Sequence, residues 1–187
     1  MGTIKDSFTF DDVTLVPQYS SVLPVDAITN CKLSKNLNLK VPLLSSAMDT
    51  ITESKMAIAI SKAGGIGIIH RNLSIEKQVS EVKKVKKNNC LVGAAIGVNA
   101  QDIERVEELS KVKTDLIVID TAHGHTKKVL NVIKKIKKVK KQKLLVGAAV
   151  GAGPSEFKRA EAILKEKIDM IVVDTAHGHT KKVSEII

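Results

Sequence analysis

From about residue 40 onward, short hydrophobic runs alternate with longer stretches that mix hydrophobic and polar residues. The short runs are almost continuously apolar, which is typical of strands buried on both faces of a parallel sheet. They predict strands over residues 41–46, 65–70, 91–97, 115–120, 144–151 and 169–174. The longer stretches have helical spacing and predict helices over 53–63, 75–87, 100–111, 127–141 and 156–166, with a last helix opening near residue 180.

The order of these elements is a repeated βα unit, which leaves an open doubly wound sheet or a closed (βα) barrel. Polar residues follow the strands, as in the clusters at residues 45–46, 70–72 and 120–121, and barrels collect functional residues at such strand ends. The first forty residues contain extended segments broken by prolines and predict a β-rich strap over one end of the sheet. We therefore expect one α/β domain over 1–187, a partial TIM-barrel-like structure of about six parallel strands.

Part of this pattern is an internal repeat. Residues 91–129 return at 145–183 with a constant offset of 54, and about 23 of the 39 paired positions are identical. The repeat includes the segment Asp-Thr-Ala-His-Gly-His, so the chain contains two copies of one candidate site. We expect only the first copy to lie beside the polar residues of the earlier strands.

Composition excludes several classes of protein. No apolar run approaches the length of roughly 18 residues that a membrane span needs, and the N-terminus does not resemble a signal peptide, so we expect a cytoplasmic protein. The net charge is +10, but the lysines of 127–143 surround a hydrophobic stripe and form a solvated helix face. With three Phe, one Tyr and no Trp, the chain has few stacking platforms for single strands, and we expect no nucleic-acid partner. Cys31 and Cys90 have no metal-binding spacing and are expected to be reduced thiols.

The segment Asp120 to His125, repeated as Asp174 to His179, is the strongest chemical signal. An Asp at the end of a strand can accept hydrogen bonds from ribose hydroxyls, and the Gly permits close approach of a ligand. Two alternatives stay open: the His-Gly-His pairs could bind a metal ion, or the Asp could simply cap the following helix.

A second candidate is Ser45-Ser46-Ala47-Met48-Asp49-Thr50, whose small hydroxyls and soft Met suit the face of a flat base and a sugar. Gly64-Gly65-Ile66-Gly67 leads into a strand rather than a helix, so it predicts a helix C-cap and close packing instead of a phosphate-binding loop. Asn99 is the predicted N-cap of the third helix, with Asp102 three residues on.

The segments FTFDDVTLVPQYSSVLP, KVPLLSSAMDT, GGIGIIHRN, VGAAIGV and VIDTAHGHT occur in this order. Together they resemble the N-terminal half of the catalytic barrel of inosine-5'-monophosphate (IMP) dehydrogenase, and resemble the related guanosine monophosphate (GMP) reductases less. The resemblance implies a TIM barrel, NAD-dependent oxidation of IMP to xanthosine monophosphate in guanine nucleotide synthesis, and a tetramer. It implies that Ser46, Met48 and Asn72 lie along the nucleotide substrate. It also implies NAD contacts at Asp120, Thr121 and Ala122, and by the repeat at Asp174, Thr175 and Ala176.

The sequence also departs from this family. The regulatory module that usually follows the second helix is not expected, because residues 80–89 pass directly to the third strand. After the fourth unit the family continues into a glycine-rich loop that carries the catalytic cysteine and a potassium site, and later a flap with an arginine base. Here the third and fourth units recur instead. A cysteine nucleophile is needed for the covalent step, so we expect no catalytic residue in this chain and no turnover by the chain alone.

Two function classes follow. The favoured one is a rearranged IMP dehydrogenase-type barrel that retains nucleotide contacts, and the alternative is a metal-dependent hydrolase-like barrel that uses the HxH pairs. Six strands are fewer than the eight of a closed TIM barrel, so the sheet has open edges and we expect a homo-oligomer.

Overall fold

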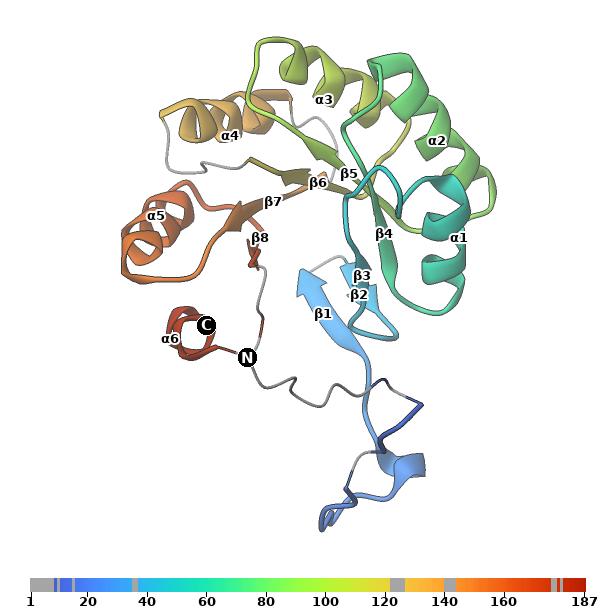
Figure 1. Ribbon diagram of the computed structural model, residues 1–187. Helices are drawn as coiled ribbons and strands as arrows, with labels where there is room; N and C mark the ends of the chain where they lie inside the picture. Colours follow the sequence, from blue (N-terminus) through green and yellow to red (C-terminus); the bar gives the residue numbers. More distant parts are fainter. Residues whose placement is uncertain are drawn as a thin grey trace, which may run out of the picture.

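A computed structural model describes residues 9, 11–14, 16–34, 37–121, 127–139, 144–175, 178 and 180–187. Its centre is a six-stranded parallel sheet in which every strand pairs with the next one along the chain. The strands are β3 (Leu44–Ser45), β4 (Ile66–Ile69), β5 (Val92–Ile96), β6 (Leu116–Ile119), β7 (Leu145–Val150) and β8 (Met170–Val173). The sheet curls into a partial barrel (Figure 1), which confirms the predicted (βα) architecture.

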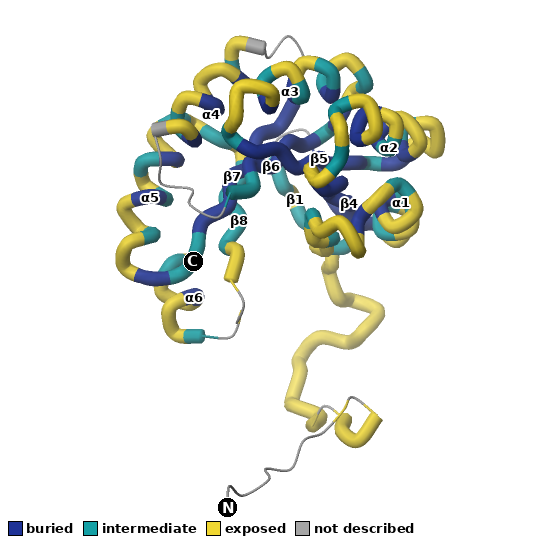
Figure 2. The backbone as a smooth tube through the Cα atoms, turned by 45° about the horizontal axis from the view of Figure 1, so that its top comes forward, coloured by how far each residue is buried: buried dark blue, intermediate teal, exposed yellow. Residues whose placement is uncertain are grey.

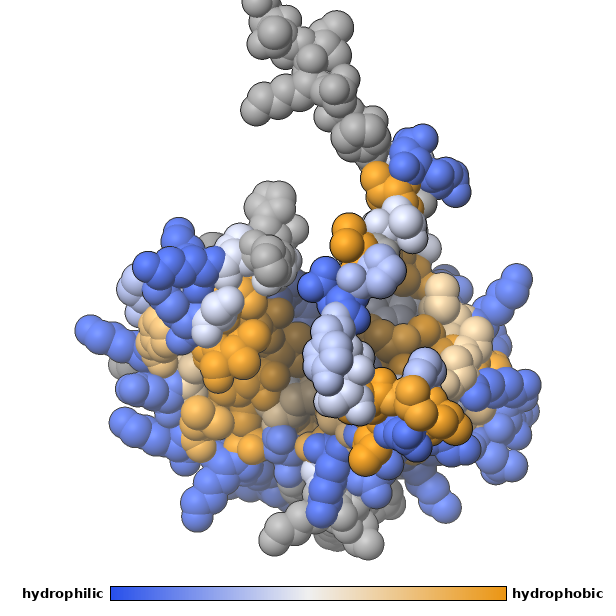
Figure 3. Space-filling view, turned by 90° about the horizontal axis from the view of Figure 1, so that it is seen from below, coloured by the Kyte–Doolittle hydropathy of each residue, from blue (hydrophilic) through white to orange (hydrophobic). Residues whose placement is uncertain are grey.

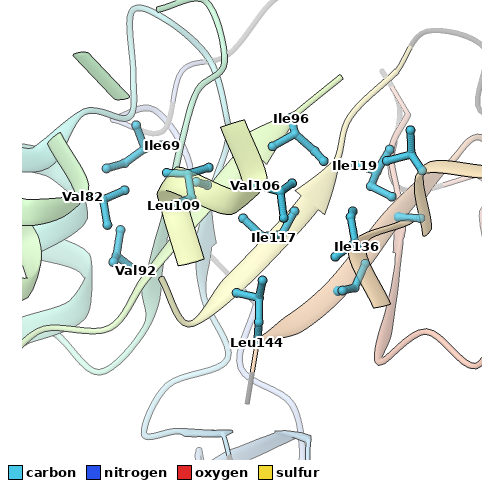
Figure 4. Packing of buried hydrophobic residues seen from close by; sticks show 14 of the residues in the cluster. Ile69, Val82, Val92, Ile96, Val106, Leu109, Ile117, Ile119, Ile136 and Leu144 are labelled. Carbon is cyan, nitrogen blue, oxygen red and sulfur yellow. The ribbon is translucent and has the colours of Figure 1, made fainter. Parts of the chain in front are cut away.

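Helices follow the strands and cover the outer face of the curled sheet (Figure 1). They are α1 (Ser54–Lys62), α2 (Ile75–Lys87), α3 (Gln101–Lys111), α4 (Lys127–Val139), α5 (Pro154–Lys165) and α6 (Lys181–Ile186). Between sheet and helices lies the larger hydrophobic core, where Val106 and Leu109 of α3 and Ile136 of α4 pack on Ile96, Ile117 and Ile119 (Figure 4). Each strand thus directs one set of side chains outward to the helices and the alternate set inward.

The inward set forms a second hydrophobic cluster. Ile66, Ile68, Ala95, Leu116, Val118 and Leu145 of the sheet pack there against Leu37 and Leu39. These two leucines belong to an antiparallel hairpin of β1 (Cys31–Ser34) and β2 (Leu37–Leu39). The hairpin is the part of the predicted strap that forms strands, and its two leucines pack on the inner face of the curled sheet.

The preceding segment differs from the prediction. Residues 16–30 contain only a short 3₁₀ turn, η1 (Pro24–Asp26), and otherwise run as exposed, irregular chain that projects from the body (Figure 2). Pro17 and Pro24 lack the backbone N–H that a strand ladder needs, which accounts for the absence of strand structure in this described stretch.

The sequence repeat is also a structural repeat. β5 pairs with β6 through Gly93 and Leu116, and β7 pairs with β8 through Gly147 and Met170, which are the matching positions of the two copies. Asp115, just before β6, accepts a hydrogen bond from the backbone N of Val92 at 2.9 Å. Its counterpart Asp169 accepts one from Val146 at 3.0 Å, so the same side chain fixes the start of the unit in both copies.

Local signals account for the ends of several helices. Gly64 has a φ of 103°, and the backbone N of Gly65 donates to the Ile60 carbonyl at 3.0 Å, which confirms the predicted C-cap of α1. Asn99 is not the N-cap of α3: the cap is Ala100, and the Asp102 carboxylate instead accepts from the Asn99 backbone N at 2.8 Å. The Asp102 side chain thus turns back and satisfies a backbone N–H just ahead of the first turn of α3. No helix among the described residues is long and apolar enough to cross a membrane.

Candidate functional site

A cavity of about 280 Å³ opens at the carboxyl ends of the strands, on the inner side of the curled sheet. Residues 44–48 around the end of β3 form one wall, and Val172 of β8 and Asp174 just after it form part of the opposite one. Ile68, Val118 and Ala149 line its floor, and Asp120 stands at its edge. The cavity is therefore largely apolar with a few polar groups at its rim, which is the usual make-up of a small-molecule site.

A tight turn after β3 shapes the first wall. The backbone N–H groups of Ile51 and Thr52 both donate to the Met48 carbonyl at 3.0 Å, which folds the chain back toward α1. The hydroxyl of Thr52, which is fully buried, lies 3.0 Å from the Ser45 hydroxyl and 2.5 Å from the Ser46 carbonyl oxygen. Met48 is left 52% exposed at the cavity wall, so its thioether side chain is free to contact a ligand.

A second, more polar cavity of about 350 Å³ adjoins the first. Ala47, Met48 and Asp120 line both cavities, so the two form one continuous mouth. The second cavity also includes Asp49 and the three consecutive residues His70, Arg71 and Asn72 that follow β4.

Each of these three residues faces a carboxylate: two of the carboxylates lie between β3 and α1, and the third follows β6. His70 Nε2 lies 3.6 Å from Glu53 Oε1, and Arg71 Nε lies 3.8 Å from Asp120 Oδ2. Asn72 Nδ2 donates to Asp49 Oδ2 at 3.1 Å. The ends of β3, β4 and β6 are thereby tied together around the mouth.

The buried amide side chain of Gln78 supports the strand ends around the mouth through hydrogen bonds. Gln78 of α2 is fully buried, and its Nε2 lies 2.9 Å from the carbonyl oxygens of His70 and Ala95, with Ile69 at 3.3 Å. Its Oε1 accepts from Arg105 Nη1 at 2.9 Å. In the second copy Arg159, the counterpart of Arg105, is 5% exposed and donates to the Ala149 carbonyl at 2.7 Å. These contacts satisfy strand-end carbonyls that would otherwise be buried without partners.

The two copies of the repeated aspartate meet at the same cavity. The backbone N of Asp120 donates to the Ile96 carbonyl at 3.0 Å, and the backbone N of Asp174 donates to the Val150 carbonyl at 2.8 Å. Each aspartate is therefore hydrogen-bonded in the same way to the end of the neighbouring strand. Both then line the first cavity together with Ser46 and Met48. Our expectation that only the first copy would lie beside the earlier strands is therefore wrong, because the curl of the sheet brings β8 round to face β3.

The remaining predicted residues divide into two groups. Thr121 is half-buried and Thr175 is exposed, and neither lines the first cavity. Ala122 and Ala176 lie outside the described residues, as do all four histidines of the two HxH motifs. Within the part of the chain that the structure describes, no group of three or more His, Cys, Asp and Glu side chains could hold a metal ion.

Comparison with known proteins gives the family. The family model for the IMP dehydrogenase / GMP reductase domain matches residues 7–142, and matches again over 138–187, a stretch that contains the second copy of the repeat. The chain belongs to the IMP dehydrogenase / GMP reductase family. This confirms the resemblance noted from the sequence, and it gives no support to a metal-dependent hydrolase.

Comparisons with individual relatives agree with this family assignment. The chain is 43% identical over 183 residues to inosine-5'-monophosphate dehydrogenase of Borreliella burgdorferi, an alignment that covers 98% of this chain and 44% of the relative. It is 41% identical over 182 residues to the enzyme of the same name from Cryptosporidium parvum, covering 96% and 42% of the two chains. A shorter match to the Aquifex aeolicus protein of that name reaches 58% identity over 85 residues, or 46% of this chain and 17% of the relative. Across the two long alignments the chain spans less than half the length of its relatives.

The sequence did not point to the residues whose hydrogen bonds support the loops and strand ends around the cavities. Gln78, Arg105 and Thr52 appear in the sequence as ordinary polar residues of helices and a loop, with no motif around them. A polar residue on the otherwise hydrophobic face of α2, next to Val79, Val82 and Val85, is the one signal that could have pointed to Gln78.

Proposed function

We propose that this chain is the nucleotide-binding part of an IMP dehydrogenase-type barrel, and that it binds IMP and NAD at the mouth of the partial barrel without oxidising IMP by itself. One observation supports it above the others: Ser46, Met48, Asp120 and Asp174, from three different strand ends, line a single cavity. Ligands of parallel αβ proteins bind at this end of the strands.

The chemistry of the wall after β3 suits the purine nucleotide. Ser46 supplies a hydroxyl and backbone groups for a sugar or phosphate, and Met48 supplies a polarisable surface for the flat base. Asn72, in the adjoining cavity, keeps its carboxamide oxygen available beyond the hydrogen bond that its nitrogen donates to Asp49. We assign these three residues to IMP.

The carboxylates suit the ribose hydroxyls of NAD, because an ionised Asp accepts two hydrogen bonds from a cis-diol. Asp120 has a side chain 36% exposed at the cavity edge, with Arg71 beside it to balance its charge. We assign Asp120, with Thr121 and Ala122, to NAD, and extend the assignment to Asp174, Thr175 and Ala176. When bound, NAD would supply the hydride acceptor, and the residues named here would bind and orient it.

The absence of turnover is proposed from the positions of the two cysteines. Cys31 lies in β1 of the hairpin, and Cys90 is 6% exposed just before β5, at the amino end of that strand. Neither lines the cavities at the carboxyl ends of the strands, so neither can reach a purine bound there. The proposal includes no potassium ion, since the loop that holds it in the family has no counterpart among the cavity-lining residues.

The test combines a binding and a turnover assay on the purified full chain. IMP and NAD are added separately and together, thermal unfolding is followed for binding, and absorbance of NADH is followed for turnover. We expect the midpoint of unfolding to rise with ligand and no NADH to form. NADH formation that depends on IMP would disprove the lack of turnover, and an unchanged midpoint at saturating ligand would disprove the binding site.

A further inference from the structure

The two copies of the repeated aspartate differ in the charges around them. Asp120 Oδ2 lies 3.8 Å from Arg71 Nε, so a positive charge balances this carboxylate at the mouth. The Asp174 carboxylate forms no ion pair with any residue that the structure describes. Both carboxylates line the first cavity, so one of the two negative charges there has no counterion among the described residues.

The order of the strands explains this difference. Arg71 is the second residue after β4, and β4 lies two strands before β6, which leads to Asp120. In the same way β6 lies two strands before β8, which leads to Asp174, and the second residue after β6 is Thr121. The repeat therefore copies the carboxylate without its arginine, because Thr121 occupies the position that corresponds to Arg71.

The apolar surroundings make the charge of Asp174 important to a bound ligand. Ile68, Val118 and Ala149 line the floor of the first cavity, and Figure 3 shows hydrophobic residues lining a hollow in the molecule seen from below. A ligand that fills such a cavity displaces water, and charges interact more strongly where water is excluded. An unbalanced carboxylate in this place favours a ligand group that carries a positive charge.

Of the two ligands assigned to the mouth, only the oxidised cofactor has such a group. The nicotinamide ring of NAD is positively charged, whereas the reduced ring of NADH is neutral. The phosphates and the ribose hydroxyls are the same in both forms, so their interactions with the carboxylates cancel when the two forms are compared. A hydride acceptor has to lie against the purine that it oxidises. With IMP assigned to the wall after β3, the wall opposite contains Val172 and Asp174.

We propose that Asp174 selects the oxidised form of the cofactor by facing its positively charged ring, whereas Asp120 accepts hydrogen bonds from the ribose hydroxyls that both forms share. The inference rests on the proposed function, and it divides between the two aspartates a role that was assigned to them jointly. The carboxylate balanced by Arg71 binds hydroxyls, and the carboxylate without a described counterion binds the cation.

Calorimetric titration of the purified full chain with NAD and, separately, with NADH tests the proposal. We expect NAD to bind roughly tenfold more tightly than NADH, and the difference to shrink as salt is added, because it arises between charges. Asp174→Asn should lower the affinity for NAD by roughly tenfold and change that for NADH by less than about twofold. Asp174→Glu keeps the charge and should keep the preference. Asp174 is exposed, so neither variant should change the thermal midpoint of unfolding.

Two further variants separate the roles of the carboxylates. Asp120→Asn should lower the affinities for NAD and NADH by the same factor, and Asp26→Asn, in the exposed 3₁₀ turn, should change neither. Equal affinities for NAD and NADH in the unaltered chain would overturn the proposal and leave the proposed function in place. An Asp174→Asn variant that loses affinity for both forms alike would also overturn it, since Asp174 would then be a second acceptor for hydroxyls. Absence of binding by either form would disprove the NAD site itself, and this inference with it.

Discussion

Asp120 and Asp174 lie 54 residues apart in the sequence, at matching positions of two copies of one repeat, and they line the same cavity. The relationship follows from parallel βα geometry, in which every strand delivers its last residue to the same end of the barrel. A duplicated unit thus duplicates a functional group within one mouth instead of building a second mouth elsewhere.

The first prediction concerns these two carboxylates. Asp120→Asn and Asp174→Asn should each weaken NAD binding, measured by calorimetric titration, by roughly tenfold, because a hydrogen bond to a charged acceptor contributes about 1.5–3 kcal/mol. Asp26→Asn, in the exposed 3₁₀ turn, is the control and should bind as the unaltered chain does. If Asp174→Asn binds NAD normally while Asp120→Asn does not, the second copy has no part in the site.

The second prediction tests the buried amide behind the site. Gln78→Met keeps the volume of the side chain but removes the donor to the His70 and Ala95 carbonyls and the acceptor for Arg105. We expect the free energy of unfolding in urea to fall by about 3 kcal/mol, because polar groups are left buried without partners. Gln101→Met, at an exposed position of α3, should change it by less than about 0.5 kcal/mol. Equal effects of the two changes would show that the hydrogen bonds of Gln78 do not stabilise the fold.

The third prediction concerns the contact of α1 with β4. A Cβ at Gly67 would lie 2.4 Å from the Cα of Ala57, a distance that only a backbone shift could relieve. Gly67→Ala should therefore lower the free energy of unfolding by about 3 kcal/mol through overpacking. Gly178→Ala has nothing within 4 Å of the added Cβ and is the matched control. A Gly67→Ala variant as stable as the control would mean that α1 does not pack on β4 as described.

The fourth prediction is a dependence of stability on pH. Burial alone would raise the pKa of Glu81, but hydrogen bonds from Lys84 and from the backbone N of Ser54 outweigh it and lower the pKa below its ordinary value of 4.5. Glu81 Oε2 accepts from that Ser54 N–H at 2.8 Å and so satisfies a donor at the start of α1. A lowered pKa means that the stabilisation is complete above about pH 4.5 and is lost as the pH falls through the folded-state value.

Glu81→Gln should accordingly cost about 1 kcal/mol at neutral pH and flatten this acidic limb of the stability curve. Urea unfolding at several pH values measures both effects. Glu107→Gln, on the exposed side of α3, serves as the control. An acidic limb that is unchanged in Glu81→Gln would assign the pH dependence to other carboxylates.

The fold could be predicted from the sequence because hydrophobic runs such as 91–97 and 115–120 have one structural interpretation when helical spacing separates them. The arrangement of the site could be predicted only in part. Ser46 and Asp120 belong to motifs, whereas the approach of Asp174 to Ser46 depends on how strongly the sheet curls, which no local pattern encodes. The pairing of His70, Arg71 and Asn72 with three separate carboxylates likewise depends on loop geometry. The exposed, irregular conformation of residues 16–30 was missed because the segment contains strand-forming residues such as Val22, Val25 and Ile28, and its conformation depends on the contacts available to it.

The central claim is that the mouth formed by Ser46, Met48, Asp120 and Asp174 binds a purine nucleotide. Calorimetric titration of IMP into the full chain tests it most directly, with Ser46→Leu, which would fill the cavity, and Ser155→Leu, on the exposed start of α5, as a matched pair. We predict saturable binding of one IMP per chain that Ser46→Leu abolishes and Ser155→Leu preserves. Absence of saturable heat, or equal affinity in the two variants, would contradict the account.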